Sequence, residues 1–228
     1  MTVALITGAN KGIGYETARQ LLELGHTVWI GARDTERGAK AAAALGARFV
    51  RLDVTDDASV NEALAAVGSA EGRLDLLVHN AGILEAEATD GPTALRVFDT
   101  NAVGIVRVTE AALPLLRASA NPTVVTVSSS MGSFWAVNNP DRVEYHLTPM
   151  LYAASKSAAT MLTVQYAKAH PGIRFNAVEP GFTATDMTAA MDGGRSPEES
   201  ARTVVRLATL GADGPTGTFQ DESGHLDW

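Results

Sequence analysis

The chain has 228 residues, of which 46% are hydrophobic and 19% are charged, so it can form one folded domain or two very small ones. Its formal net charge of −8 argues against nucleic acid and against an anionic membrane surface as partners. The absence of cysteine excludes disulfides, thiolate metal sites and a catalytic thiol.

The first residues do not have the features of a targeting segment. The stretch MTVALITGAN has no basic flank and only a short apolar run, which makes a signal peptide improbable. No segment approaches the roughly 18 consecutive apolar residues of a membrane span. We therefore expect a cytoplasmic protein with no membrane association.

Short β-branched runs alternate along the chain with longer segments of helical period, which is typical of a parallel sheet covered by helices. Strands are predicted at 3–7, 27–31, 48–52, 74–78, 123–128 and 173–178, with a weaker seventh at 217–220. Helices are predicted near 13–24, 35–45, 57–68, 93–117, 150–169 and 197–210. The last begins with a capping box formed by Ser196 and Glu199. The expected fold class is α/β: a single doubly wound Rossmann-type domain over residues 1–228, with a mostly parallel seven-stranded sheet and helices on both faces.

Two stretches, 131–148 and 182–195, do not fit this alternation. Loops longer than about 12 residues in a compact domain are more often functional than idle. We expect both stretches to form walls of a substrate pocket.

A glycine-rich turn follows the first predicted strand. Glycines allow the positive φ angles and the close backbone approach that a turn around a pyrophosphate needs, and the next helix offers free N–H groups to the anion. The spacing is neither a Walker A loop nor G-x-G-x-x-G, and a tight turn without a ligand is the alternative. The candidate phosphate-binding residues are Gly8, Asn10, Lys11, Gly12, Ile13 and Gly14.

The end of the second predicted strand indicates which nicotinamide cofactor is preferred. An NAD site normally has an acidic residue there for the ribose 2′-hydroxyl, but Ala32 occupies the expected position. Arg33 and Arg37 follow, and together with Lys11 they form a cationic cluster suited to a 2′-phosphate. This pattern favours NADP(H) over NAD(H), with solvated surface charges beside acidic neighbours as the alternative.

Tyr152 and Lys156 are four residues apart, so a helix over 150–169 places them on one face. An unperturbed tyrosine, with a pKa of about 10, is a poor acid/base catalyst at neutral pH, but a nearby ammonium lowers its pKa. We therefore expect Tyr152 to transfer a proton, with Lys156 lowering its pKa. A plain surface pair is the alternative.

Three serines, Ser128, Ser129 and Ser130, follow the fifth predicted strand. Ligands of open parallel sheets bind beyond the carboxyl ends of the strands, so a hydroxyl there could hold a substrate carbonyl. A serine hydrolase is disfavoured because Ser129 lacks the G-x-S-x-G elbow. The five histidines show no metal-ligand spacing, so no metal site is expected.

Together these motifs resemble those of the short-chain dehydrogenase/reductase family. They follow the family's order over residues 2–187, and 214–228 is similar to the end of carbonyl-reductase-like members. The matching motifs are Thr7-Gly8 with Gly12-Ile13-Gly14, Leu52-Asp53-Val54, Asn80-Ala81-Gly82, Asn101, Ser128 to Gly132, Tyr152 with Lys156, and Pro180-Gly181 followed by Thr183 and Thr185.

The resemblance implies a role for each matching residue. It makes Tyr152 the proton donor in reduction and Lys156 the group that binds the nicotinamide ribose and lowers the tyrosine pKa. It makes Ser129 the ligand of the carbonyl oxygen and Asn101 the holder of a relay water. It also implies hydride transfer from the B face of the nicotinamide. Further implied cofactor contacts are Asp53 and Val54 at the adenine, Asn80, Ala81 and Gly82 after the fourth strand, and Pro180, Gly181, Thr183 and Thr185 near the nicotinamide.

The chain departs from the family pattern in two places. His79 replaces the first Asn of the Asn-Asn-Ala-Gly motif, and 22 residues separate Ser129 from Tyr152, more than is common. The resemblance to carbonyl reductases with an insertion here implies that the inserted residues cap the substrate pocket and obstruct helix faces used for oligomerisation. A homo-oligomer and a monomer both stay open. The insertion contains Phe134, Trp135, Tyr145, His146 and Met150.

The expected function is reduction of a ketone or aldehyde by NADP(H), or the reverse, with an apolar small molecule as substrate. A 3-oxoacyl thioester or hydroxysteroid reductase with the same four catalytic residues is the alternative within the family. An NADP-sensing regulator without turnover is the alternative of another class. Phe182, Met187 and Met191 are further candidates for an apolar pocket wall, or else for the core.

Overall fold

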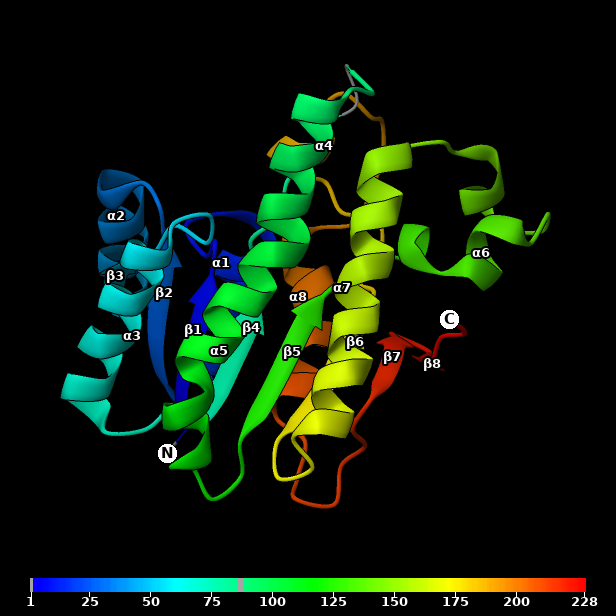
Figure 1. The fold of residues 1–228 in the computed structure, drawn as a ribbon. Coiled ribbons are helices and arrows are strands. Elements are labelled where there is room, and N and C mark those ends of the chain that lie inside the picture. Colours follow the sequence, from blue (N-terminus) through cyan, green and yellow to red (C-terminus); the bar gives the residue numbers. More distant parts are fainter. Residues whose placement is uncertain (1, 86–87) are drawn as a thin grey trace.

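The chain folds around one twisted sheet with helices on both faces (Figure 1). The computed structural model describes residues 2–85 and 88–228, so residues 1 and 86–87 of the predicted domain 1–228 lie outside the described residues. The strands are β1 (Val3–Thr7), β2 (Thr27–Ala32), β3 (Arg48–Arg51), β4 (Leu76–His79), β5 (Thr123–Val127), β6 (Arg174–Val178), β7 (Thr218–Asp221) and β8 (Gly224–His225). The helices are α1 (Gly12–Glu23), α2 (Thr35–Leu45), α3 (Asp57–Glu71), α4 (Gly91–Phe98), α5 (Gly104–Arg117), α6 (Phe134–Asn138), α7 (Met150–Ala169) and α8 (Pro197–Ala208).

The strand order is β3-β2-β1-β4-β5-β6-β7-β8, and among the strands of the described residues only β7 and β8 pair antiparallel. The predicted doubly wound α/β fold is therefore confirmed. The weak seventh strand is present as β7, and β8 adds an eighth strand of two residues that the sequence did not predict. The capping box at the start of α8 is also confirmed.

Three predicted segments have more internal structure than expected. The predicted helix 93–117 is divided into α4 and α5 by a π-helical stretch, Asp99–Val103. The segment 131–148 contains α6 and two short 3₁₀ turns, Ser130–Gly132 and Val143–His146. A 3₁₀ turn at Asp186–Thr188 lies within the segment 182–195.

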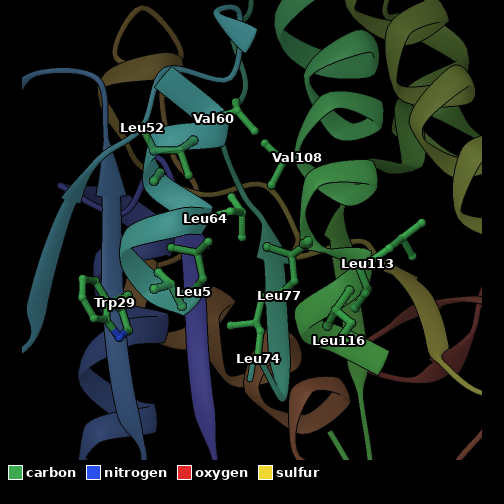
Figure 2. Packing of buried hydrophobic residues seen from close by; sticks show 14 of the residues in the cluster. Leu5, Trp29, Leu52, Val60, Leu64, Leu74, Leu77, Val108, Leu113 and Leu116 are labelled. Atoms are coloured by element: carbon green, nitrogen blue, oxygen red, sulfur yellow. The ribbon is translucent and has the colours of Figure 1, made fainter. Parts of the chain in front are cut away.

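The core lies in two layers because side chains of a buried strand alternate between the two faces of the sheet. In β1, Leu5 packs with residues of α3 and α5, whereas Ile6 packs on the opposite face with residues of α1, α2 and α8. Figure 2 shows the first layer, in which Leu64 of α3 and Val108 of α5 lie against the strands. Each fully buried leucine or valine contributes about 1.5–3 kcal/mol to folding.

The strand order reverses between β1 and β4, and parallel sheets bind ligands at the carboxyl edge of such a switch point. Hydrogen bonds join the two strand ends there. Asn80 Nδ2 donates to Thr7 O at 2.9 Å and to Gly8 O at 3.1 Å. In return, Thr7 Oγ1 accepts from Asn80 N and Ala81 N, both at 3.0 Å. This edge, with the neighbouring ends of β5 and β6, holds the candidate site.

The described residues contain neither a membrane-spanning helix nor a cluster of metal-ligating side chains. No helix of residues 2–85 and 88–228 has the length and apolar character that a membrane span requires. The same residues contain no group of three or more His, Asp or Glu side chains arranged to hold a metal ion. The cytoplasmic location stays a prediction.

His79 ends β4 with its side chain buried, 4% exposed. Its Nε2 lies 2.9 Å from Thr109 Oγ1 of α5. Burial lowers the pKa of the imidazole from its ordinary value to about 3. His79 is therefore neutral in the folded protein.

Because the folded pKa of His79 lies below the unfolded value, its contribution to stability is complete above about pH 6.5 and is lost as pH falls toward 3. We expect the free energy of unfolding to fall with a slope approaching ~1.4 kcal/mol per pH unit from this group alone. In His79→Asn this part of the slope should disappear. Urea unfolding across this pH range measures it, with His146→Asn, at an exposed position, as the matched control. Equal acid slopes in wild type and His79→Asn would contradict the account.

Candidate active site

Asn101 is fixed inside the π-helical stretch between α4 and α5. Its side chain is 2% exposed, accepts from Ile83 N at 2.8 Å and donates to Ile83 O at 2.9 Å. Its Nδ2 also donates to Ser155 Oγ of α7 at 3.0 Å. π-Bulges inside helices occur frequently at functional sites. The stretch thereby connects the residues after β4 with the helix that carries the Tyr–Lys pair.

Tyr152 and Lys156 lie on one face of α7, as predicted, and Ser129 reaches them from the end of β5. The Ser129 hydroxyl is hydrogen-bonded to the Tyr152 hydroxyl. Lys156 Nζ donates to Val127 O at 2.8 Å and lies 5.6 Å from the centroid of the Tyr152 ring. A Cβ built on Gly82 would lie 3.4 Å from Asn101 Oδ1 and 3.6 Å from Lys156 Nζ. The four candidate catalytic residues therefore converge at one edge of the sheet.

The electrostatics of this group differ from the sequence expectation. Burial, and then the charge of Glu179, raise the pKa of the Tyr152 hydroxyl above its ordinary value, while the bond to Ser129 lowers it. Burial lowers the pKa of Lys156 to about 8, and Glu179 opposes that shift. The sequence led us to expect a lowered Tyr152 pKa, whereas in this arrangement burial and Glu179 outweigh the lowering effects and raise it.

The glycine-rich turn depends on glycine for both its backbone conformation and its packing. Gly8 has φ +65°, and a Cβ there would lie 2.9 Å from Ala81 Cα, so both the conformation and the close approach need glycine. Lys11, the N-cap of α1, makes no side-chain cap bond within the described residues, whereas Asp34 and Asp56 cap α2 and α3. The N–H groups of α1 thus remain available to an anion. Gly12, Ile13 and Gly14 form the first turn of α1, directly after Asn10 and Lys11.

The predicted cationic cluster is only partly formed. Arg33 is exposed after β2, and its charge helps to keep the pKa of Asp53 below the ordinary value although burial opposes that shift. Arg37 Nε pairs with Asp34 at 2.8 Å. Lys11 pairs with Asp186 at 2.6 Å, on the segment 182–195. Arg33 thus acts on the carboxylate of Asp53, a predicted adenine contact.

The remaining predicted cofactor residues lie at the same edge. Asp53 accepts from Thr55 N at 3.0 Å, and Val54 packs against Gly104 of α5. Thr183 is buried and donates to Gly181 O at 2.8 Å. The other predicted contacts are Asn80, Ala81 and Gly82 after β4, Pro180 two residues after the end of β6, and Thr185 directly before the 3₁₀ turn Asp186–Thr188.

The segments 131–148 and 182–195 carry exposed apolar side chains, and both lie near the candidate catalytic residues in the sequence. In the segment 131–148, Trp135 N donates to Trp228 O at 2.9 Å, and Arg142 stacks on the Trp135 ring at 5.2 Å. The candidate wall residues are exposed and not part of the core: Phe134, Trp135, Tyr145, Met150, Phe182, Met187 and Met191. Two open depressions of about 320 and 370 Å³ lie at the opposite edge, beside Ser119, and include none of them.

The sequence pattern did not indicate the roles of three residues that support this site. Ser155 anchors Asn101, and Thr7 anchors Asn80, although Thr7 was identified as part of the family motif. Glu179 was not considered at all, and it is the one whose charge reaches Tyr152 and Lys156. The available signal was a carboxylate directly after a predicted strand and immediately before Pro180.

Comparison with known proteins agrees with this geometry. A family model for short chain dehydrogenases matches residues 2–195. The chain is 35% identical to a short-chain dehydrogenase/reductase of Stachybotrys chlorohalonatus, covering 97% of this chain and 88% of that protein. It is 34% identical to (-)-isopiperitenone reductase of Mentha piperita, covering 95% of both. The crystal structure of NADPH-bound carbonyl reductase from chicken fatty liver superposes with a TM-score of 0.89 at 27% identity, covering 100% of each chain.

The chain therefore belongs to the short-chain dehydrogenase/reductase family, as its motifs indicated. It is an oxidoreductase of that family with a Rossmann-like fold.

A substitution at Gly132 tests how closely the turn after Ser129 packs against α7. A Cβ at this position would lie 2.6 Å from Lys156 C and 2.7 Å from Ser157 N, both backbone atoms of α7. In Gly132→Ala either the turn or the helix must shift, so we expect the free energy of unfolding to fall by about 1–3 kcal/mol. Gly172→Ala is the control, because nothing lies within 4 Å of its added Cβ. Denaturant unfolding measures both, and equal stability of Gly132→Ala and wild type would contradict this packing.

Proposed function

We propose that the protein is an NADP(H)-dependent reductase of ketones or aldehydes, working in either direction, built as one NAD(P)-binding unit over residues 1–228. The observation that carries this proposal is the convergence of Asn101, Ser129, Tyr152 and Lys156 where β4 and β5 end. Membership of an oxidoreductase family supports it.

The proposed chemistry divides between the cofactor and the side chains. The bound nicotinamide would supply the hydride for the carbonyl carbon. Tyr152 would donate its proton to the carbonyl oxygen, and the raised pKa of Tyr152 keeps that proton on the hydroxyl at neutral pH. Ser129 would hydrogen-bond the same oxygen, Lys156 would hold the nicotinamide ribose, and Asn101 would hold a water of the proton relay.

Preference for NADP(H) is proposed from the end of β2. Ala32 leaves no carboxylate to bind a ribose 2′-hydroxyl there, and the exposed Arg33 follows it directly. The similar carbonyl reductase from chicken fatty liver binds NADPH, which supports the same preference in this chain.

The proposed substrate is an apolar small molecule held by the insertion and by the segment 182–195. Their exposed aromatic and methionine side chains offer apolar contact area. A panel of ketones, aldehydes, 3-oxoacyl thioesters and hydroxysteroids distinguishes the carbonyl reductase from the thioester and steroid alternatives. Binding of NADPH without its oxidation across that panel would instead support the regulator.

Replacing the proton donor tests the mechanism. In Tyr152→Phe we expect kcat for carbonyl reduction to fall by about 10²–10⁴, because the phenyl ring has no proton to transfer. NADPH binding should be retained. The readout is carbonyl-dependent loss of NADPH absorbance, with Tyr166→Phe on the same helix as control. Full activity of Tyr152→Phe on a confirmed substrate would sink the mechanism.

Removing the arginine after β2 tests the cofactor preference. We expect Arg33→Ala to weaken NADPH binding by roughly 10–100-fold and NADH binding far less, because it removes a charge-assisted contact to a phosphate that only NADPH carries. Fluorescence titration with both cofactors measures the ratio. Arg117→Ala, at the opposite edge of the sheet, is the control. Equal weakening of both cofactors would refute the assignment.

A further inference from the structure

Glu179 is a carboxylate that the functional motifs do not include, placed directly after β6. Its own N–H donates to Gln220 O of β7 at 2.8 Å, so its backbone is fixed at the carboxyl edge of the sheet. One carboxylate oxygen accepts from the N–H of Ser130, and the other accepts from the N–H of Gly181 at 2.7 Å.

These two hydrogen bonds connect two turns of the candidate site. Ser130 follows the carbonyl ligand Ser129, and Gly181 begins the path into the segment 182–195. Gly181 has φ +81°, a conformation that holds its N–H in the turn toward Glu179 without strain only because it is glycine. A carboxylate that accepts from two backbone N–H groups is well suited to fix both turns.

The charge of Glu179 also acts on the candidate proton donor and on the lysine. Lys156 is buried, and the hydrogen-bond acceptor of its Nζ, Val127 O, is a neutral carbonyl. A buried ammonium needs a compensating negative charge, because its transfer from water is costly. Among the interactions resolved for the described residues, Glu179 is the carboxylate that favours the charged form of Lys156.

A second carboxylate nearby is already compensated. Glu144, on the insertion, is 6% exposed and takes two bonds from Arg142, at 2.8 and 3.0 Å. Burial opposes its ionisation, but the Arg142 bonds keep the pKa of Glu144 below its ordinary value. The titratable and charged groups around Glu179 come from several elements: Tyr152 and Lys156 of α7, Arg142 and Glu144 of the insertion, Asp221 of β7, and Arg195 and Arg206. Asp221 acts on Arg142, Arg195 donates to Pro180 O, and Arg206 donates to Gln220.

We propose that Glu179 is a positioning residue of the reduction site: its carboxylate joins the Ser129 turn to the Gly181 turn, at the edge of the sheet where the Tyr–Lys pair lies. This inference rests on the proposed reductase function.

The two electrostatic effects of the Glu179 charge have the same direction. A neighbouring anion makes both protons harder to remove, so it raises the pKa of Tyr152 and the pKa of Lys156. Burial raises the pKa of Glu179 itself, whereas the Ser130 and Gly181 bonds favour its ionised form. Reduction requires a protonated Tyr152 and a charged Lys156, so Glu179 extends the reductive activity toward alkaline pH.

Two substitutions separate the effect of the Glu179 charge from the effect of its side-chain length. Glu179→Gln keeps the length and removes the charge, so we expect the alkaline limb of kcat/KM for carbonyl reduction to move about one unit toward lower pH. Glu179→Asp keeps the charge but cannot span both N–H groups, so we expect a lower kcat with the alkaline limb in place. Glu144→Gln, which removes a carboxylate already paired with Arg142, should leave the limb in place.

An unshifted limb in Glu179→Gln, or an equal shift in Glu144→Gln, would overturn the proposal. A second measurement needs no turnover. The absorbance of the Tyr152 phenolate is followed as pH rises, and it is assigned by subtracting the spectrum of Tyr152→Phe. The phenolate absorbance should appear at lower pH in Glu179→Gln than in wild type. If it appears at the same pH in both proteins, or in neither, the proposal is overturned. If wild type reduces no carbonyl in the panel, the proposed function fails, and the phenolate onset still decides the role of Glu179.

Discussion

Hydrogen bonds between the ends of β1 and β4 are the constraint on which the candidate site depends. The side chain of each residue, Asn80 and Thr7, is hydrogen-bonded to the backbone of the other, which ties the two strand ends together where the strand order reverses. The close contact leaves room only for glycine at Gly8 and at Gly14, where an added Cβ would lie 2.4 Å from the Asn80 amide nitrogen. The same edge carries Gly82 toward Lys156. One set of contacts therefore fixes both the glycine-rich turn and the position of the candidate catalytic group.

Much of this arrangement could be predicted because it depends on local patterns. Buried parallel strands are short apolar runs, and the residues of the glycine turn and of the Tyr–Lys pair are close in sequence. The bounds of β1 and α2 agree with the prediction residue for residue. The resemblance to a known family, confirmed by the match over residues 2–195, identified the candidate residues that are distant in sequence.

The features that escaped prediction depend on contacts between distant residues. The π-helical stretch at Asn101 depends on bonds to Ile83 and Ser155, which no helical period reveals. The two-residue strand β8 has no pattern of its own and forms only by pairing with β7. The Tyr152 pKa depends on burial and on Glu179, 27 positions along the chain, so the spacing of Tyr152 and Lys156 alone gave the wrong direction.

Charge is distributed unevenly in this acidic protein. The chain carries a net charge of −8, yet Arg33 is exposed directly after β2, and Lys156 of α7 is buried with its Nζ bonded to Val127 O at the end of β5. Lys11 and Arg37 are each paired with a carboxylate, at 2.6 and 2.8 Å. The electrostatic potential at each position therefore depends on the few charged side chains near it more than on the net charge. These nearby charges determine where an anionic cofactor and a protonated tyrosine are favoured.

The most direct test of the proposed function is a crystal structure of the protein with NADPH and a ketone bound together. It should place the ketone oxygen within hydrogen-bond distance of both the Tyr152 hydroxyl and Ser129 Oγ, with the 2′-phosphate at Arg33. A ketone bound with its oxygen away from Tyr152, or a cofactor whose phosphates do not lie on the turn before α1, would contradict the account.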